Sequence, residues 1–397
     1  MTSLPVDPTR RRFVRTVAGT TIAAALPLSG CGHFAAAIPD SANAAWTPEP
    51  ASADPRVRAL SWAILAPNPH NRQPWLMELS GDDEIVVRID TERLLPETDP
   101  FGRQIVIGTG AMLGLLDIAA ASAGFTTETR YFEDGEFGRI IDARLVARVR
   151  FVPGAGNGAD AELFPLIPVR RTVKSAYDPA RAPDAAFARD LATLSRADGI
   201  ATEIVTHEAS PERAAEVAAL VRRAWEIELR DPAAFMESMR LLRVGAKEID
   251  RHRDGISITS PFLVTVDRLG LFDRSEPPPP DSSILTGQIE DFDLEIASTP
   301  AYFAMTSRGN GRVDQLEVGK AYVRAQLHAT ARGLVMHPLS QALQEYAAMA
   351  QAYADAQALL GGPGETVQMI CRLGYLPEDE SLPPASPRRG LDAHLVT

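Results

Sequence analysis

The segment Ala66–Trp75, with the sequence APNPHNRQPW, carries the densest set of side chains that could contact a small molecule. Its three prolines fix the backbone angle φ at three places, so the segment cannot be a regular helix or a central strand. It is expected to be a stiff loop that presents the amide and imidazole groups of Asn68, His70, Asn71 and Gln73. These donors and acceptors suit the edge and face of a planar heterocycle. An ordinary turn after a helix would have the same composition.

One short helix is expected to position this loop, and two long helices are expected at the centre of the fold. A short amphipathic helix over Pro55–Leu65 delivers it. The apolar runs Gly110–Phe125 and Gly319–Leu334 each predict a helix buried on most of its surface. Gly124 and Gly333 stand where a helix C-terminus favours positive φ. The equal spacing of the glycines indicates an internal duplication, although two unrelated alanine-rich helices would also look alike.

The loop resembles the P-S-x-x-N-x-Q-P-W loop of the nitroreductase family of FMN oxidoreductases. The matching residues are Pro67, Asn71, Gln73, Pro74 and Trp75. Asn68 stands where serine is usual in that family, and a proline follows it. The resemblance implies a loop that lines the isoalloxazine ring of FMN through Pro67, Asn68, Asn71 and Gln73.

A basic segment, Arg170–Lys174, fits the phosphate end of the same cofactor. Arginine forks bind a phosphate dianion in bidentate fashion. By resemblance, Arg170 and Thr172 contact the phosphate or ribityl chain, and Arg171 supplies a second arginine fork to the cofactor site. Lys174 reaches the pyrimidine side of the ring, where a cation stabilises the anionic reduced flavin. Read without the resemblance, the segment could equally be a solvated basic loop.

Two further segments are implied by the resemblance. Arg388 and Arg389 follow a strand expected over Val367–Tyr375 and would close the phosphate site. Ser340 and Gln341 follow the second long helix and would lie near the reactive N5 edge of the ring. The alternatives are a disordered tail for the first segment and a proline that only ends a strand for the second.

The order of these motifs predicts a fused dimer. Single-domain members of the family begin with the arginine motif, whereas here the loop comes first and neither motif is repeated. Two identical subunits share each flavin in the family. We therefore expect an α+β nitroreductase-like fold of two tandem subdomains, residues 54–152 and 159–397, that form an intramolecular pseudo-dimer. One FMN site would be complete and one lost.

The irregular stretch at about 243–283 is interpreted as a lid-like insertion.

The implied activity is that of an FMN-dependent oxidoreductase. A small-molecule donor would reduce the flavin, and a nitroaromatic- or quinone-like acceptor would take the electron pair. No catalytic side chain is required, because the cofactor carries the chemistry. A protein that holds flavin with little or no turnover is the alternative, and an envelope scaffold that has lost the site is a third possibility.

The N-terminus resembles a twin-arginine export signal. Arginines at 10–12 precede an apolar run that ends in a lipoprotein cleavage box at Cys31. Residues 1–31 would be the signal peptide and 32–53 a linker. The expected partner is the twin-arginine export machinery, and the expected place is the periplasm or cell envelope, with a lipid on Cys31 as the one membrane contact. A weak membrane anchor, or cleavage near Ala35–Ala37 without a lipid, remains an alternative.

Composition and missing motifs argue against other classes of protein. The net charge is −12 over 397 residues, and no dense basic block follows the leader, which argues against nucleic acid as a partner. The seven histidines show no metal-ligand spacing, so no metal is expected. The turn at Gly108–Gly114 has leucine at the third glycine position of a dinucleotide-binding fingerprint. There is no G-x-S-x-G motif for a hydrolase nucleophile.

Overall fold

The computed structural model describes residues 37–48, 52–154, 156, 158–197 and 199–396. The export signal expected over residues 1–31, with its Cys31, lies outside the described residues.

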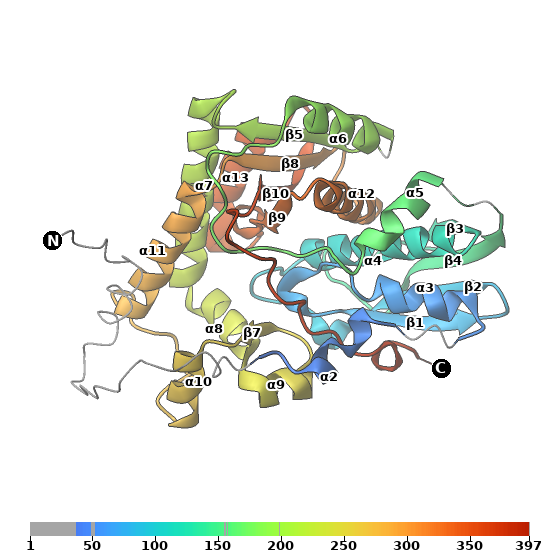
Figure 1. The fold of residues 1–397 in the computed structure, drawn as a ribbon, viewed down its shortest axis with the longest axis horizontal. Coiled ribbons are helices and arrows are strands. Elements are labelled where there is room, and N and C mark those ends of the chain that lie inside the picture. The colour runs from blue at the N-terminus through green and yellow to red at the C-terminus, as the bar shows by residue number, and fades with distance from the viewer. Residues whose placement is uncertain (1–36, 49–51, 155, 157, 198, 397) are drawn as a thin grey trace.

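The described chain is α+β, with two four-stranded antiparallel sheets (Figure 1). The first sheet has the order β1-β2-β4-β3. Its strands are β1 Trp75–Ser80, β2 Glu84–Ile89, β3 Phe125–Tyr131 and β4 Leu145–Pro153. The second sheet has the order β5-β8-β10-β9. Its strands are β5 Ala201–Thr206, β8 Ala301–Ser307, β9 Val335–Pro338 and β10 Thr366–Gly374.

Both sheets are built from the chain in the same way. In each, a helix precedes two strands, a long helix follows, and two more strands complete the sheet, with the fourth strand lying between the second and third. The leading helices are α3 Pro55–Ala63 and α6 Ala185–Ala197, and the long helices are α4 Arg103–Ser122 and α12 Arg312–Ala331. The shared connectivity is a stronger sign of internal repetition than the similarity of two helices.

The two long helices are confirmed, and both begin before the glycines from which they were predicted. Gly124 and Gly333 follow their C-terminal ends with φ of 83° and 72°, the left-handed conformation that favours glycine. Helix α4 is long and apolar enough to span a membrane, but 94% of its apolar window is buried inside the fold. It is therefore the core helix of the molecule as described.

The long helices α4 and α12 cross in backbone contact at a pair of glycines. A Cβ added to Gly110 would lie 2.1 Å from the carbonyl oxygen of Leu316, and one added to Gly319 would lie 2.0 Å from the carbonyl oxygen of Ile107. Gly110 and Gly319 are as far apart in sequence as Ile107 and Leu316. Exchanging the two helices therefore turns one contact into the other, which is the signature of a two-fold arrangement.

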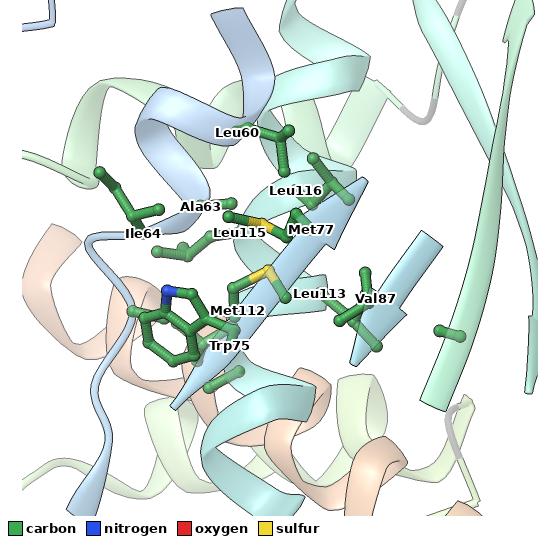
Figure 2. Packing of buried hydrophobic residues seen from close by; sticks show 14 of the residues in the cluster. Leu60, Ala63, Ile64, Trp75, Met77, Val87, Met112, Leu113, Leu115 and Leu116 are labelled. Atoms are coloured by element: carbon green, nitrogen blue, oxygen red, sulfur yellow. The ribbon is translucent and has the colours of Figure 1, made fainter. Parts of the chain in front are cut away.

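Trp75, the last residue of the predicted loop, anchors that loop in the core. Its indole is fully buried among side chains of α3, β1 and α4 (Figure 2). Burial of so large an apolar group is worth roughly 2–3 kcal/mol. The loop is therefore fixed at the end where it becomes strand β1.

Long segments exchange between the halves. The connecting arm, residues 158–174, includes α5 Gly158–Leu163 and reaches the second sheet, where Thr172 forms a parallel bridge with Met336. The C-terminal arm, residues 375–396, returns to the first sheet, where Leu395 bridges Met77. The region that joins the halves thus also carries both predicted arginine motifs.

A large insertion, residues 207–300, separates β5 from β8. It contains five helices and one parallel strand pair: α7 Pro211–Arg230, α8 Pro232–Arg240, β6 Leu242–Val244, α9 Gly245–His252, β7 Ile256–Ile258, α10 Pro261–Arg268 and α11 Ser283–Ala297. The prediction that 243–283 is irregular was wrong for residues 243–268, whereas residues 269–282 contain neither helix nor strand. Pro261 does not interrupt structure there but begins α10, behind the N-cap residue Ser260.

A linker was expected over residues 32–53, but residues 37–48, in its centre, contain regular structure. Asp40–Asn43 forms helix α2, and Ala44–Trp46 forms a 3₁₀ turn. The ring of Trp46 is buried against the connecting and C-terminal arms, so an apolar anchor fixes this stretch. The other described helices are α13 Ala350–Leu360 and the short 3₁₀ turns Pro69–Asn71, Thr91–Arg93, Phe164–Leu166, Gln341–Leu343, Ala347–Met349 and Leu391–Ala393.

Candidate functional site

The loop Ala66–Trp75 is confirmed as a loop, and its backbone is strained. His70, Asn71 and Gln73 all have φ near +50°, a conformation that side chains other than glycine rarely adopt. Asn68 supports this shape: its Oδ1 accepts a hydrogen bond from the Gln73 amide at 2.7 Å, and its Nδ2 donates to the Ala66 carbonyl at 3.0 Å. The asparagine that replaces the usual serine thus serves the fold of the loop itself.

Two buried arginines from distant parts of the chain meet at the start of this loop. Arg170 Nη2 and Arg388 Nη2 both donate to the carbonyl of Leu65, at 3.0 and 3.2 Å. Arg388 Nη1 also donates to Asn71 Oδ1 at 2.7 Å. The predicted loop and the two predicted arginine motifs therefore face one region of the molecule.

These arginines lack an anionic partner. In the described part of the chain, no carboxylate lies within ion-pair distance of Arg170, Arg171 or Arg388. Arg170 and Arg388 are each less than 5% exposed, and the Nε atoms of both lack a hydrogen-bond partner. Burial lowers the pKa of Arg170 to about 10, and burial with the charges of Arg170 and Arg171 lowers that of Arg388 to about 9. Buried charge without a counter-ion is costly.

Trp46 covers this arginine cluster, and no sequence motif points to it. The guanidinium carbons of Arg170, Arg171 and Arg388 lie 5.9, 4.9 and 5.3 Å from its ring centroid. Its Nε1 donates to the Ser386 carbonyl at 2.8 Å. A single tryptophan in an alanine- and proline-rich stretch was the available signal.

Gln73 and Arg389 lie behind the loop. Gln73 Oε1 accepts from the Arg389 backbone amide at 2.9 Å, and Arg389 Nη2 donates to the Gln73 carbonyl at 2.9 Å. Gln73 Nε2 donates to the carbonyl of Arg253, in the insertion, at 2.8 Å. In this geometry both side chains brace the loop, and a ligand contact for either stays a prediction.

Lys174 connects the loop with the second half. Its side chain is exposed, yet the surrounding protein lowers its pKa by desolvation. Its charge reaches His70 in the loop and His337 on β9. Burial is the larger cause and the Lys174 charge the second. Together they lower the pKa of His70 to about 4 and that of His337 well below its usual value. Both histidines are neutral near pH 7, and their Nδ1 atoms lack partners.

The remaining predicted residues lie on neighbouring elements. Thr172 precedes Lys174 and pairs through its backbone with Met336 on β9. Ser340 and Gln341 follow β9, where Ser340 caps a short 3₁₀ turn. Gln344, which follows the same turn, donates through Nε2 to Oε2 of Glu228 at 2.6 Å; Glu228 is a buried carboxyl on α7 to which no sequence motif points. A lone glutamate in a helix with many charged residues gave no usable signal.

The insertion covers the loop. His70 Nε2 lies 3.1 Å from Ser238 Oγ, and the Gly255 amide donates to the Asn71 carbonyl at 3.3 Å. Asp254 joins the insertion to the first half, with one oxygen 2.8 Å from Arg93 Nη1 and the other 2.8 Å from Arg243 Nη2. A lid role for the insertion stays a prediction, but the structure places it directly over the loop.

His394 gives the C-terminal arm a pH-dependent attachment. Its side chain is fully buried, and burial together with the Arg389 charge lowers its pKa to about 3. The unfolded chain binds a proton below pH 6.5 that the folded chain excludes, so stability falls as pH drops from about 6.5 towards 3. At pH 4 the loss of unfolding free energy from this residue is about 3 kcal/mol.

Urea unfolding at pH 7 and pH 4 tests this effect of His394. Between these two pH values, His394→Gln should lose less unfolding free energy than the wild type. The same change at the exposed His252 is the control, and equal losses in all three proteins would contradict the assignment.

Comparison with known proteins places the chain near a group of reductases. No protein-family model matches it. Two Mycobacterium tuberculosis proteins, each named "Putative NAD(P)H nitroreductase", are 28% identical over 352 residues and 26% identical over 341 residues. Each alignment covers 84% of this chain, with 93% and 88% of the respective relative.

Solved structures were matched as well. One is an FMN-dependent nitroreductase from Mycobacterium smegmatis in complex with NADPH, with 17% identity, 59% of this chain and 96% of that chain covered, and a TM-score of 0.35. Another is a nitroreductase with bound FMN from Bacteroides fragilis, with 14% identity, 58% and 96% covered, and a TM-score of 0.33. By its sequence relatives, the chain is a distant homologue of proteins named as NAD(P)H nitroreductases.

Proposed function

We propose that the protein is an FMN-dependent oxidoreductase of the nitroreductase type, which passes an electron pair from a small-molecule donor to a nitroaromatic- or quinone-like acceptor. The observation that carries the proposal is the pair Arg170 and Arg388, buried without a carboxylate partner and bonded to the same carbonyl at the root of a strained loop. A phosphate dianion would neutralise these charges and satisfy their orphaned Nε atoms.

In this proposal each group of side chains has one task. Arg170, Arg171 and Arg388 hold the phosphate, with Trp46 closing that end. The loop, braced by Gln73 and Arg389, offers its Asn71 face to the ring. The ring supplies hydride chemistry when FMN is bound.

On the other side, Lys174 would lie towards the pyrimidine edge, where its charge would favour the reduced anionic ring. Its lowered pKa reflects a partly desolvated ammonium, whose field is stronger than it would be in water. Thr172, Ser340 and Gln341 would complete the polar lining.

We also propose that the chain is a fused pseudo-dimer with one complete cofactor site. The identical connectivity of the two sheets and the two-fold crossing at Gly110 and Gly319 support this arrangement. So do the two arms, because the connecting arm that follows the first half bridges β9 and the C-terminal arm of the second half bridges β1. The site loop belongs to the first half, whereas the arginines lie on the two exchanged arms.

A second candidate function is a flavin-holding protein with little turnover. The insertion favours it, because three of its residues bond to the loop: Ser238, Arg253 and Gly255. Asp254, next to them in the chain, forms an ion pair with Arg93 of the first half. Such a cover restricts the approach of a nicotinamide donor. Export to the cell envelope, where NAD(P)H is scarce, would also suit a holder.

Anaerobic mixing of the FMN-loaded protein with NADPH tests the proposed function. An oxidoreductase should lose its flavin absorbance within seconds, and addition of a quinone should restore it. An unchanged spectrum contradicts turnover with this donor. Asp254→Asn then separates the candidates, because loosening the insertion should allow bleaching if the cover alone blocks the donor. Asp190→Asn, at an exposed ion pair on α6, is the matched control.

A further inference from the structure

The first described segment of the chain, residues 37–48, lies over the arginine cluster and is attached on two sides. Ala42 and Trp46, four residues apart, are its two buried residues. On one side, the Ala42 carbonyl accepts from the Arg388 amide at 3.1 Å, and Trp46 Nε1 donates to the Ser386 carbonyl at 2.8 Å. The segment is therefore joined to the C-terminal arm at a residue whose guanidinium group belongs to the cluster.

On the other side, the segment is attached to the insertion. Ser41 Oγ donates to Asp250 Oδ1 at 2.7 Å, and Arg253 Nη2 donates to the same oxygen at 2.9 Å. The carbonyl of Arg253 in turn accepts from Gln73 Nε2, in the site loop, at 2.8 Å. Helix α2 thus lies between α9 and the C-terminal arm (Figure 1). Bonds on both sides fix the segment in place, although half of its contacts are made by exposed residues of a short helix.

The indole of Trp46 covers the arginine cluster without neutralising it. Its ring centroid lies 4.9 to 5.9 Å from the guanidinium carbons of Arg170, Arg171 and Arg388. An aromatic face attracts cations but carries no net charge, so the three cations remain available to an anion. An anion bound by all three guanidinium groups would have the indole as a neighbour on one side.

We propose that residues 37–48 form a clasp over the phosphate end of the cofactor site, and that Trp46 makes this site select a terminal phosphate over a flavin dinucleotide. The inference rests on the proposed function and adds to it the residue that sets the choice of cofactor. The clasp comes from the start of the described chain and belongs to neither repeated half, so the duplication did not supply it.

The chemistry of the two flavin nucleotides explains why a cover at this place would discriminate between them. In FMN the phosphate ends the molecule, and its three free oxygens and double charge match three guanidinium groups. In flavin adenine dinucleotide (FAD) the same phosphate has two free oxygens and a single charge, and it continues into a second phosphate and adenosine. Those extra groups would need space next to the cluster, and the Trp46 indole fills one side of it.

Trp46→Leu tests the selectivity, because leucine keeps an apolar anchor for the clasp but fills much less space. Calorimetric titration of the apoprotein with FMN and, separately, with FAD measures both affinities. The wild type should bind FMN about 100-fold more tightly than FAD, and Trp46→Leu should reduce this ratio to about 10-fold or less. Trp46→Phe should lie between them. The control is Trp225→Leu, which removes an indole stacked on Phe292 within the insertion and should keep the ratio of the wild type.

A second measurement needs no variant. If clasp and phosphate touch, each stabilises the other by the same free energy. Addition of FMN to the wild-type apoprotein should therefore slow amide hydrogen exchange in residues 37–48, whereas riboflavin, which lacks the phosphate, should not.

Three results would overturn the proposal while leaving FMN binding intact. They are equal affinities of the wild type for FMN and FAD, an unchanged ratio in Trp46→Leu, and exchange in residues 37–48 that FMN does not slow. A wild type that binds no FMN would instead overturn the proposed function.

Discussion

Arg388→Met is expected to weaken FMN binding about 100-fold, because a charge-assisted bond to phosphate is worth about 2.7 kcal/mol. Arg388 is chosen because its guanidinium bonds to Leu65, Ala66 and Asn71 while no carboxylate neutralises it. Titration of apoprotein with FMN, followed by quenching of flavin fluorescence, measures the change. Purified Arg388→Met should also be largely colourless.

The apoprotein itself should fold normally after this change. Five carbonyl oxygens lose a donor, namely the backbone oxygens of Leu65, Ala66, Ser386 and Pro387 and Oδ1 of Asn71. A buried cation without a counter-ion is removed at the same time, and the two effects offset each other. Arg388→Lys should lie between the wild type and Arg388→Met, because lysine keeps the charge but not the fork. Arg213→Met, at a half-exposed ion pair with Glu203, should leave FMN affinity unchanged. Full flavin content in purified Arg388→Met would refute the phosphate assignment.

Gly319→Ala is expected to destabilise the protein by about 3 kcal/mol or more, the upper range for overpacking. The new Cβ would lie 2.0 Å from the Ile107 carbonyl oxygen, 2.6 Å from the Ala111 amide nitrogen and 2.8 Å from the Gly110 Cα. All three are backbone atoms, so α4 and α12 must separate. Thermal unfolding followed by circular dichroism should show a melting temperature several degrees lower.

This change should also reduce FMN binding, because Gly108 on α4 packs against Asn68 of the loop and moves with the helix. The control is Gly158→Ala, at the start of α5, where an added Cβ meets nothing within 4 Å. That variant should keep the stability of the wild type to within about 0.5 kcal/mol. A fully stable Gly319→Ala would show that the helices do not cross in contact.

Much of the site could be predicted because its residues have strong local preferences. Prolines at fixed positions predicted the loop before Trp75, and terminal glycines predicted the ends of α4 and α12. The order of the motifs along the chain also predicted that the loop and the arginines would lie together. They do, because Arg170 and Arg388 both donate to the carbonyl of Leu65, at the start of the loop.

Other features depended on contacts that no local pattern reveals. Trp46 is ordered by arginines more than a hundred residues away, so its stretch resembled a linker. Helix α10 lies within the stretch that was expected to be irregular, and it begins at Pro261, whose missing amide hydrogen costs nothing in a first turn. The environment of Glu228 arises only when α7 packs against the turn after β9.

The central claim is that one flavin nucleotide is held at the seam between two related halves. Denaturing the purified protein and comparing released FMN, by absorbance and chromatography, with the amount of chain tests it directly. The account predicts one FMN per chain after saturation. No FMN, or two per chain, would contradict it.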